Sequence, residues 1–273
     1  MENFKVLCSS GAFIGRKNGR NHKLFLDVCD TVCADGFEFM MYDSWYEKTD
    51  EVIGDFKAKG LYTPTLHADK MIGEHLGRKN ANLALQNFKK NCEIANKIGA
   101  QKIVLHLWNG PSSDDNIDYN ISALGELYAI AGEHAVTLTV ENVVCRNSDP
   151  LEHLYAIANK YDAAKFTLDT KMSAFHGTLE NVYSSDFKWL WDRVEHLHVN
   201  DYFGKVKEWE SLATLHIGQG NIDFDRFFRF IKSLALKITL TLECTSMGEG
   251  CELYPEKMNE SIKKVRKFLA QGE

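Results

Sequence analysis

Acidic and imidazole side chains end six segments of the sequence that have the pattern of β-strands. In residues 136–141, Thr alternates with apolar residues, and the run ends at Glu141. Such alternation favours a strand with one apolar and one polar face. Five other runs end on their polar face in the same way, at His67, His106, Asp169, His198 and Glu243. Strand ends that gather at one rim would bring these side chains into a single site.

Four of these residues have the types that a divalent cation prefers: Glu141, Asp169, His198 and Glu243. Three carboxylates close together repel one another, so one would stay protonated unless a cation lay among them. Mixed carboxylate and imidazole ligands are typical of Mn²⁺, Co²⁺, Zn²⁺ or Fe²⁺ rather than Ca²⁺. The alternative is that each carboxylate caps a loop or pairs with Arg or Lys. We predict that the four residues together form a metal site.

The order of the expected elements predicts an α/β protein built as a (β/α)8 TIM barrel. Strand-like and helix-like segments alternate eight times with no linker-like tract between them, which is typical of a parallel sheet. A chain of 273 residues suits a single closed barrel, since such barrels take roughly 250 residues. We therefore expect one barrel domain over residues 1–273. Active sites of such barrels lie at the carboxyl ends of the strands, where all six polar residues fall.

Four segments between strands are also predicted from their composition. After the strand that ends at His67, we expect a loop over 68–78 and then a long helix over 80–98. After the strand that ends at Asp169, we expect the next helix around 179–193. The loop over 200–221 is the longest that follows a strand.

The composition bears on partners and location. The sequence has 32 basic and 38 acidic residues, a net charge of −6, which gives no general electrostatic reason to bind nucleic acid or an anionic membrane. No apolar run approaches the roughly 20 residues of a membrane span. The cysteines are odd in number, and the chain opens on a strand-like run rather than a secretion signal. We therefore expect reduced thiols in a cytoplasmic protein.

Short pieces of the sequence, in order from the third expected strand to the eighth, match a known pattern. They are Thr65-Leu66-His67-Ala68, Val104-Leu105-His106, Val140-Glu141-Asn142, Leu168-Asp169, His196-Leu197-His198-Val199-Asn200-Asp201, Ile217-Gly218-Gln219-Gly220-Asn221-Ile222-Asp223-Phe224 and Leu242-Glu243. Together they resemble the xylose-isomerase-like barrel superfamily, in particular the sugar isomerase/epimerase family that also contains endonuclease IV. The resemblance spans nearly the whole chain.

The resemblance implies a catalytic divalent metal held by Glu141, Asp169, His198 and Glu243. In the family's ketose epimerases the two glutamates also act as an acid/base pair: one removes the proton next to the substrate carbonyl, an enediolate forms, and the other returns a proton. The implied substrate is a small polyhydroxylated molecule, a ketose or related polyol, whose hydroxyls His67 and His106 would bind. Many family members are dimers or tetramers, so a homo-oligomer is one option.

Four other residues are candidates for substrate contact. Glu38 could touch the substrate or pair with Lys or Arg inside the barrel, and Trp108 could cover a sugar ring or pack in the core. Lys171 could bind a carboxylate or phosphate of the substrate, or be solvated. His216 could line the rim or be an ordinary loop residue. The nearby Gly218-Gln219-Gly220 lacks the third Gly and the preceding strand of a dinucleotide fingerprint, so we interpret it as loop geometry.

Two positions depart from the family pattern. Met172 stands where the epimerases usually carry a His, and Gly204 stands where they commonly carry an Arg. Both family residues grip the substrate, so the departures affect the reaction more than the metal. Two alternatives therefore stay open: a metal-dependent hydrolase or lyase, including an endonuclease-IV-like phosphodiesterase, and a non-catalytic sugar-binding barrel. The nuclease relatives use three zinc ions, and His67 and His106 leave a dinuclear centre open here.

Overall fold

Eight strands in chain order form a closed parallel barrel, which confirms the predicted (β/α)8 fold. The computed structural model describes residues 4–271. The strands are β1 (Phe4–Ser9), β2 (Gly36–Met40), β3 (Thr65–His67), β4 (Lys102–Leu105), β5 (Thr137–Glu141), β6 (Lys165–Asp169), β7 (Val194–His198) and β8 (Ile238–Leu242). The six strands β3 to β8 end at, or one residue before, the strand ends predicted from the sequence.

The connecting helices begin and end at residues with recognisable capping chemistry. They are α1 (His22–Val28), α2 (Thr49–Ala58), α3 (Met71–Gly77), α4 (Ala81–Ile98), α5 (Ile117–Glu133), α6 (Pro150–Lys160), α7 (Thr170–Phe175), α8 (Lys188–Trp191), α9 (Phe224–Ser233) and α10 (Pro255–Ala270). The Asp149 carboxylate accepts from the backbone of Leu151, with Pro150 in the first turn of α6. Gly99 ends α4 in the left-handed conformation. None of the helices within residues 4–271 combines the length and apolar character needed to cross a bilayer.

The predicted loop over 68–78 is wrong, because α3 occupies most of it. The Asp69 carboxylate accepts a hydrogen bond from the Met71 backbone at 3.0 Å and so supports the first turn. Ile72 and Leu76 are fully buried, which gives the short helix an apolar face. The polar residues between them concealed this pattern in the sequence.

The predicted helix around 179–193 is also wrong. Only α8, at Lys188–Trp191, is α-helical there, and it follows two short 3-10 turns. The helix instead starts directly after β6, as α7, because the Asp169 carboxylate accepts a hydrogen bond from the Met172 backbone at 2.9 Å. A residue predicted only as a metal ligand therefore also caps a helix.

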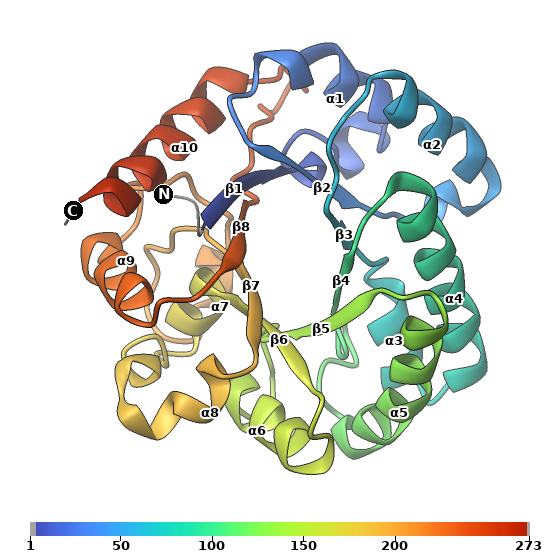
Figure 1. Cartoon of the computed structure of the whole chain (residues 1–273), viewed down its shortest axis with the longest axis vertical. Helices are drawn as coiled ribbons and strands as arrows, with labels where there is room; N and C mark the ends of the chain where they lie inside the picture. Colours follow the sequence, from blue (N-terminus) through green and yellow to red (C-terminus); the bar gives the residue numbers. More distant parts are fainter. Residues whose placement is uncertain (1–3, 272–273) are drawn as a thin grey trace. The chain divides into compact units, whose positions relative to one another are not determined.

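The described residues fall into two compact units. Unit 1 consists of the described parts of 1–38, 169–187 and 195–273, and unit 2 consists of 39–168 and 188–194. In unit 1, β1 pairs with both β2 and β8, and β8 also pairs with β7. The neighbouring helices α9 and α10 lie outside this sheet, with α10 against β1 and β8 (Figure 1). In unit 2, β3 to β6 pair in order, and α4 and α5 lie side by side against β4 and β5.

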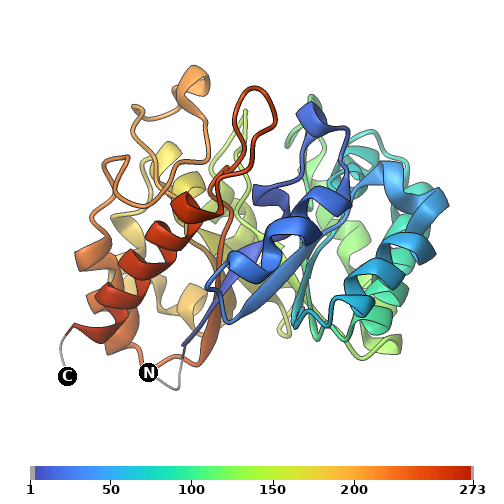
Figure 2. The ribbon, with the colours of Figure 1, turned by 90° about the horizontal axis from the view of Figure 1, so that it is seen from above.

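Each unit has polar residues on the inner face of its strands. In unit 2, the hydroxyls of Thr139 on β5 and Thr167 on β6 are 2.7 Å apart and fully buried. In unit 1, His196 on β7 is hydrogen-bonded to Thr241 on β8 at 3.0 Å. The loops after β7 and β8 extend from the same side of unit 1, in orange and red in Figure 2. The polar strand ends of this unit therefore share one rim with its longest loops.

Candidate metal and substrate site

Three of the four predicted metal ligands come together in unit 1. The donor atoms of Asp169, His198 and Glu243 lie within 4.8 Å of one another. His198 Nδ1 is 3.4 Å from a Glu243 carboxylate oxygen. Asp169 and His198 are completely buried, whereas the Glu243 side chain is 13% exposed. We call Asp169, His198, Asn200 and Glu243 the unit-1 cluster.

Asn200 links the two carboxylates of the unit-1 cluster. Its amide nitrogen donates to Asp169 Oδ2 at 3.0 Å and to Glu243 Oε2 at 3.2 Å, and its amide oxygen accepts from the Glu243 backbone at 3.0 Å. The Thr170 hydroxyl accepts from the Asn200 backbone N–H and donates to its carbonyl. Asn200 thus fixes where both acids point. It was not among the predicted site residues, although it stands in the piece from His196 to Asp201 that matches the family pattern.

The imidazole of His198 is held from its other side by Glu38. Its Nε2 lies 3.3 Å from Glu38 Oε2, and His196 Nε2 lies 3.2 Å from the same oxygen. Burial alone would raise the pKa of the Glu38 carboxyl, but His198 and His196 outweigh it and hold that pKa well below its usual range. Glu38 is therefore an ionised acceptor, to which His198 donates its Nε2–H.

The donor set of unit 1 fits a divalent cation. With the ring proton on Nε2, a neutral His198 presents the lone pair of Nδ1 to the Glu243 carboxylate 3.4 Å away. A lone pair and a carboxylate oxygen at that distance repel each other unless a proton or a metal cation lies between them. A set of imidazole nitrogen and carboxylate oxygen atoms suits Zn²⁺, Mn²⁺, Co²⁺ or Fe²⁺. The residues present are thus compatible with the predicted metal.

The other strand-end residues form a second cluster in unit 2, made of His67, His106 and Glu141. Glu141 Oε2 lies 2.8 Å from His106 Nε2 and 3.5 Å from His67 Nε2. The two rings stand edge to face with their centres 4.8 Å apart. The Nδ1 atom of each ring contacts a neighbouring group. His67 Nδ1 donates to the Ala68 carbonyl at 2.9 Å, and His106 Nδ1 lies 3.3 Å from Asn109 Oδ1. We call these three residues the unit-2 cluster.

Burial determines the charge of the His106 imidazole in the unit-2 cluster. Burial lowers the pKa of His106 to about 4, although the Glu141 carboxylate opposes this shift. His106 is therefore neutral at pH 7. A neutral imidazole has one donor and one acceptor nitrogen, which is what binding a hydroxyl group requires.

The remaining candidates for substrate contact have structural partners. Trp108 is fully buried in unit 2, where its indole N–H donates to the Val143 carbonyl at 3.0 Å. Both ring nitrogens of His216 in unit 1 are hydrogen-bonded, to the Ser261 hydroxyl at 3.0 Å and the Thr245 carbonyl at 3.1 Å. Burial lowers the pKa of His216. Substrate contact by either residue stays a prediction.

Lys171 has a buried side chain and follows Asp169 of the unit-1 cluster by two residues in the sequence. It is the second residue of α7 and only 6% exposed, and its ammonium donates to the Thr214 hydroxyl at 2.9 Å. Within residues 4–271 it forms no ion pair with a carboxylate. A lysine with a neutral partner can accept an anionic group as an additional partner, so the prediction that it binds a substrate carboxylate or phosphate stays open.

A buried aspartate shapes the glycine-containing loop after β7. The Asp201 carboxylate accepts hydrogen bonds from the backbones of Gly218 and Gly220, each at 2.8 Å, and of Ile222 at 3.2 Å. A Cβ atom added at Gly220 would lie only 2.4 Å from Asp201 Oδ1. The glycines therefore serve loop geometry, as predicted, rather than a dinucleotide.

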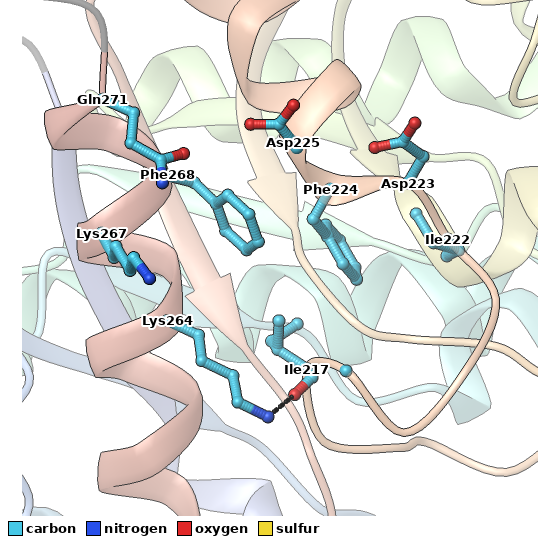
Figure 3. Close-up of a pocket in the computed structure, with 10 residues that line it drawn as sticks. Ile217, Ile222, Asp223, Phe224, Asp225, Lys264, Lys267, Phe268 and Gln271 are labelled. Carbon is cyan, nitrogen blue, oxygen red and sulfur yellow. Dashed lines mark hydrogen bonds between the residues drawn. The ribbon is translucent and has the colours of Figure 1, made fainter.

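A separate cleft of about 440 Å³ lies between α9 and α10 in unit 1 (Figure 3). Its lining residues are Ile217, Gly218, Ile222, Asp223, Phe224, Asp225, Lys264, Lys267, Phe268 and Gln271. None of them belongs to the unit-1 cluster. Lys264 already donates to the Ile217 carbonyl at 2.6 Å, and Asp223 caps α9. The two clusters at the strand ends are therefore the better candidates for the functional site.

The chain matches one known protein family over most of its length. Residues 27–271 match the sequence model of the xylose isomerase-like TIM barrel family. The chain belongs to this family. No curated protein matches the chain significantly in sequence. The family assignment confirms the resemblance seen in the sequence, and the strand order of the barrel agrees with it.

Several solved structures share the fold of this family member. A D-tagatose 3-epimerase-like protein is 17% identical with a TM-score of 0.71, covering 97% of this chain and 98% of its own. The D-allulose 3-epimerase from Methylomonas sp., in complex with D-allulose, is 14% identical with a TM-score of 0.71, covering 98% of both chains. A structure of IOLI protein with a zinc atom is 19% identical with a TM-score of 0.70, covering 98% of both. At these identities the likeness shows the fold.

Proposed function

We propose that the protein is a metal-dependent isomerase or epimerase of a small polyhydroxylated substrate, a ketose or related polyol. The observation that carries this proposal is the unit-1 cluster, in which Asn200 holds the carboxylates of Asp169 and Glu243 beside His198 Nδ1. The structural neighbours support the same reaction class, because they include sugar epimerases. In this proposal the metal is Mn²⁺, Co²⁺, Zn²⁺ or Fe²⁺.

Glu141 is proposed as the fourth ligand. Support comes from the strand register, in which Glu141 on β5 pairs with Thr167 on β6. Asp169 lies two residues beyond Thr167 and therefore on the same face of β6. Neighbouring strands are about 4.8 Å apart. Glu141 and Asp169 would thus occupy adjoining positions at the inner rim.

The proposed chemistry assigns a separate task to each residue. A divalent cation, when bound, supplies a Lewis acid for the substrate oxygen that gains negative charge. Glu141 and Glu243 are the proposed acid/base pair, one removing the proton next to the carbonyl and the other returning a proton. Each positioned acid or base contributes on the order of 10²–10⁴-fold in rate. His67 and His106 would bind and orient the substrate hydroxyls.

The test is elemental analysis of the purified protein beside the Glu243→Gln variant, after loosely held metal has been removed. We expect about one equivalent of Mn, Co, Zn or Fe per chain, sharply reduced in the variant. Exchange of a substrate C–H with deuterated water, screened over ketoses, then tests the acid/base pair. No metal in either protein, even after addition of Mn²⁺ or Co²⁺, would overturn the proposal and favour a sugar-binding barrel.

The unit-2 cluster supports a second candidate, a metal-dependent hydrolase or lyase that includes phosphodiesterases. Because His67 Nδ1 donates to the Ala68 carbonyl, a neutral His67 turns an acceptor nitrogen toward Glu141. His67, His106 and Glu141 could then hold another cation. Two or three zinc ions per chain, together with incision of abasic DNA, would favour this candidate over the epimerase.

A further inference from the structure

Glu38 is enclosed in unit 1 and faces two imidazoles. It is 0% exposed, and its Oε2 atom lies 3.2 Å from His196 Nε2 and 3.3 Å from His198 Nε2. Its other oxygen has no hydrogen-bond partner within residues 4–271. These contacts suit a residue that acts through its neighbours better than one that meets a substrate directly.

The two ring nitrogens of His198 face different carboxylates. Nε2 faces Glu38, and Nδ1 faces Glu243 at 3.4 Å. A neutral imidazole carries one N–H, and an ionised carboxylate only accepts. When Nε2–H donates to Glu38, the lone pair on Nδ1 is directed to the side where Asp169 and Glu243 lie.

We propose that Glu38 is a positioning residue, which fixes the tautomer and orientation of His198 so that Nδ1 is the atom offered to a metal ion. This inference rests on the proposed function, because the metal is part of that proposal. A histidine that ligates a metal usually donates its other N–H to a carboxylate, a carbonyl or water, and loss of such a partner typically costs 10–100-fold in metal affinity.

His196 supplies the internal control. It shares Glu38 with His198, but its Nδ1 lies 2.5 Å from the Thr239 hydroxyl, and its Nε2 lies 3.0 Å from the Thr241 hydroxyl. Both threonines are on β8 and hold this ring against that strand. Thr239→Val therefore removes a hydrogen bond from the same side-chain network, at nearly constant volume, without touching His198.

The experiment compares Co²⁺ binding to metal-stripped wild type, Glu38→Gln and Thr239→Val by calorimetric titration. We expect Glu38→Gln to bind Co²⁺ about 10–100-fold more weakly, and Thr239→Val to stay within about 3-fold of wild type. Thermal unfolding of both variants checks that they are folded. Equal losses in the two variants would mean general disruption of the barrel interior and would overturn the proposal.

A second measurement reads the tautomer without any metal. Long-range ¹⁵N–¹H NMR spectra of the metal-free proteins, at a pH where the ring is neutral, should show the Nε2–H tautomer of His198 in wild type and a mixture of the Nε2–H and Nδ1–H tautomers in Glu38→Gln. If wild type binds no Co²⁺, the proposed function fails, and these spectra still test Glu38 separately. If Glu38→Gln does not fold, the wild-type spectrum decides alone: a proton on Nδ1 would overturn the proposal.

Discussion

The two clusters at the strand ends use the same residue types but are supported in different ways. In the unit-1 cluster, Asn200 orients the two carboxylates, and Glu38 contacts His198 from the other side. In the unit-2 cluster, both imidazoles turn Nε2 toward the same oxygen of Glu141. In unit 1 the carboxylates therefore share an amide donor and the imidazole has a carboxylate behind it, whereas in unit 2 the two imidazoles meet one carboxylate and are held from behind by the Ala68 carbonyl and the Asn109 amide.

Because of this difference, the two clusters are suited to different tasks, metal binding in unit 1 and substrate binding in unit 2. A metal ion needs its ligands held at fixed positions, and groups behind the ligands provide that rigidity. A neutral imidazole beside a carboxylate, such as His106, can instead exchange donor and acceptor roles with substrate hydroxyls. We therefore expect substitutions in the unit-1 cluster to change metal affinity, and substitutions of the unit-2 histidines to change substrate binding.

The largest effect is expected from Glu243→Gln, which removes both a metal ligand and a proposed acid/base group. The amide cannot take up a proton, so the turnover number should fall on the order of 10²–10⁴-fold even when metal is added in excess. Steady-state kinetics with the best substrate from the deuterium-exchange screen measures this. Turnover within a few-fold of wild type would remove Glu243 from the chemistry.

Asn200→Leu should have the next largest effect. The variant leaves the buried carboxylates of Asp169 and Glu243 without their common donor, so we expect metal affinity to fall about 10–100-fold. Asn120→Leu is the matched control, because Asn120 in unit 2 is equally buried and donates to the Leu107 carbonyl at 2.9 Å. Both variants should lose stability, but only Asn200→Leu should lose metal affinity. Identical titration curves would contradict a role for Asn200.

Asp114 joins the loops that follow β4 and β5, beside the unit-2 cluster. Its carboxylate accepts from the backbones of Arg146, Asn147 and Ser148 at 3.0 Å and from His153 at 3.1 Å. Asp114→Asn should lower the free energy of unfolding at pH 7 by roughly 1–3 kcal/mol, because these donors lose a charged acceptor. Denaturant unfolding of wild type and variant measures the difference.

The pH dependence of that difference has a definite sign. Burial opposes ionisation of Asp114, but the donors outweigh it and lower its pKa to about 2. A carboxyl whose folded pKa lies below its unfolded value of about 3.9 stabilises the protein above pH 4 and loses this contribution as the pH falls toward 2. The gap between wild type and Asp114→Asn should therefore shrink over that range. A constant gap would contradict the assignment.

The smallest effect is expected from His106→Gln. Loss of one hydrogen bond to a substrate hydroxyl costs about 1 kcal/mol, or roughly 5-fold in KM, while metal content stays unchanged. Elemental analysis and kinetics on the same preparation measure both quantities. A fall in bound metal instead would indicate that the unit-2 cluster also holds a cation, and would favour the hydrolase or lyase.

The order of elements and the residue types at the strand ends could be predicted from the sequence. Alternating Thr and apolar residues revealed β5, β6 and β8, and their ends revealed Glu141, Asp169 and Glu243, because a strand is defined by local periodicity. The helices α3 and α7 were missed, since both are short and each is preceded by an aspartate whose side chain accepts from a backbone N–H two or three residues on. Such a hydrogen bond leaves little trace in hydrophobic periodicity.

The supporting groups of the site could not be predicted in this way. Glu38 and His198 are 160 residues apart in the chain, and Asn200 and Glu243 are 43 apart. Such contacts depend on the register in which strands pair and on the packing of side chains inside the sheet, neither of which is written in a local pattern. The chemistry at the strand ends is thus a property of the sequence, whereas its orientation by Glu38 and Asn200 is a property of the folded chain.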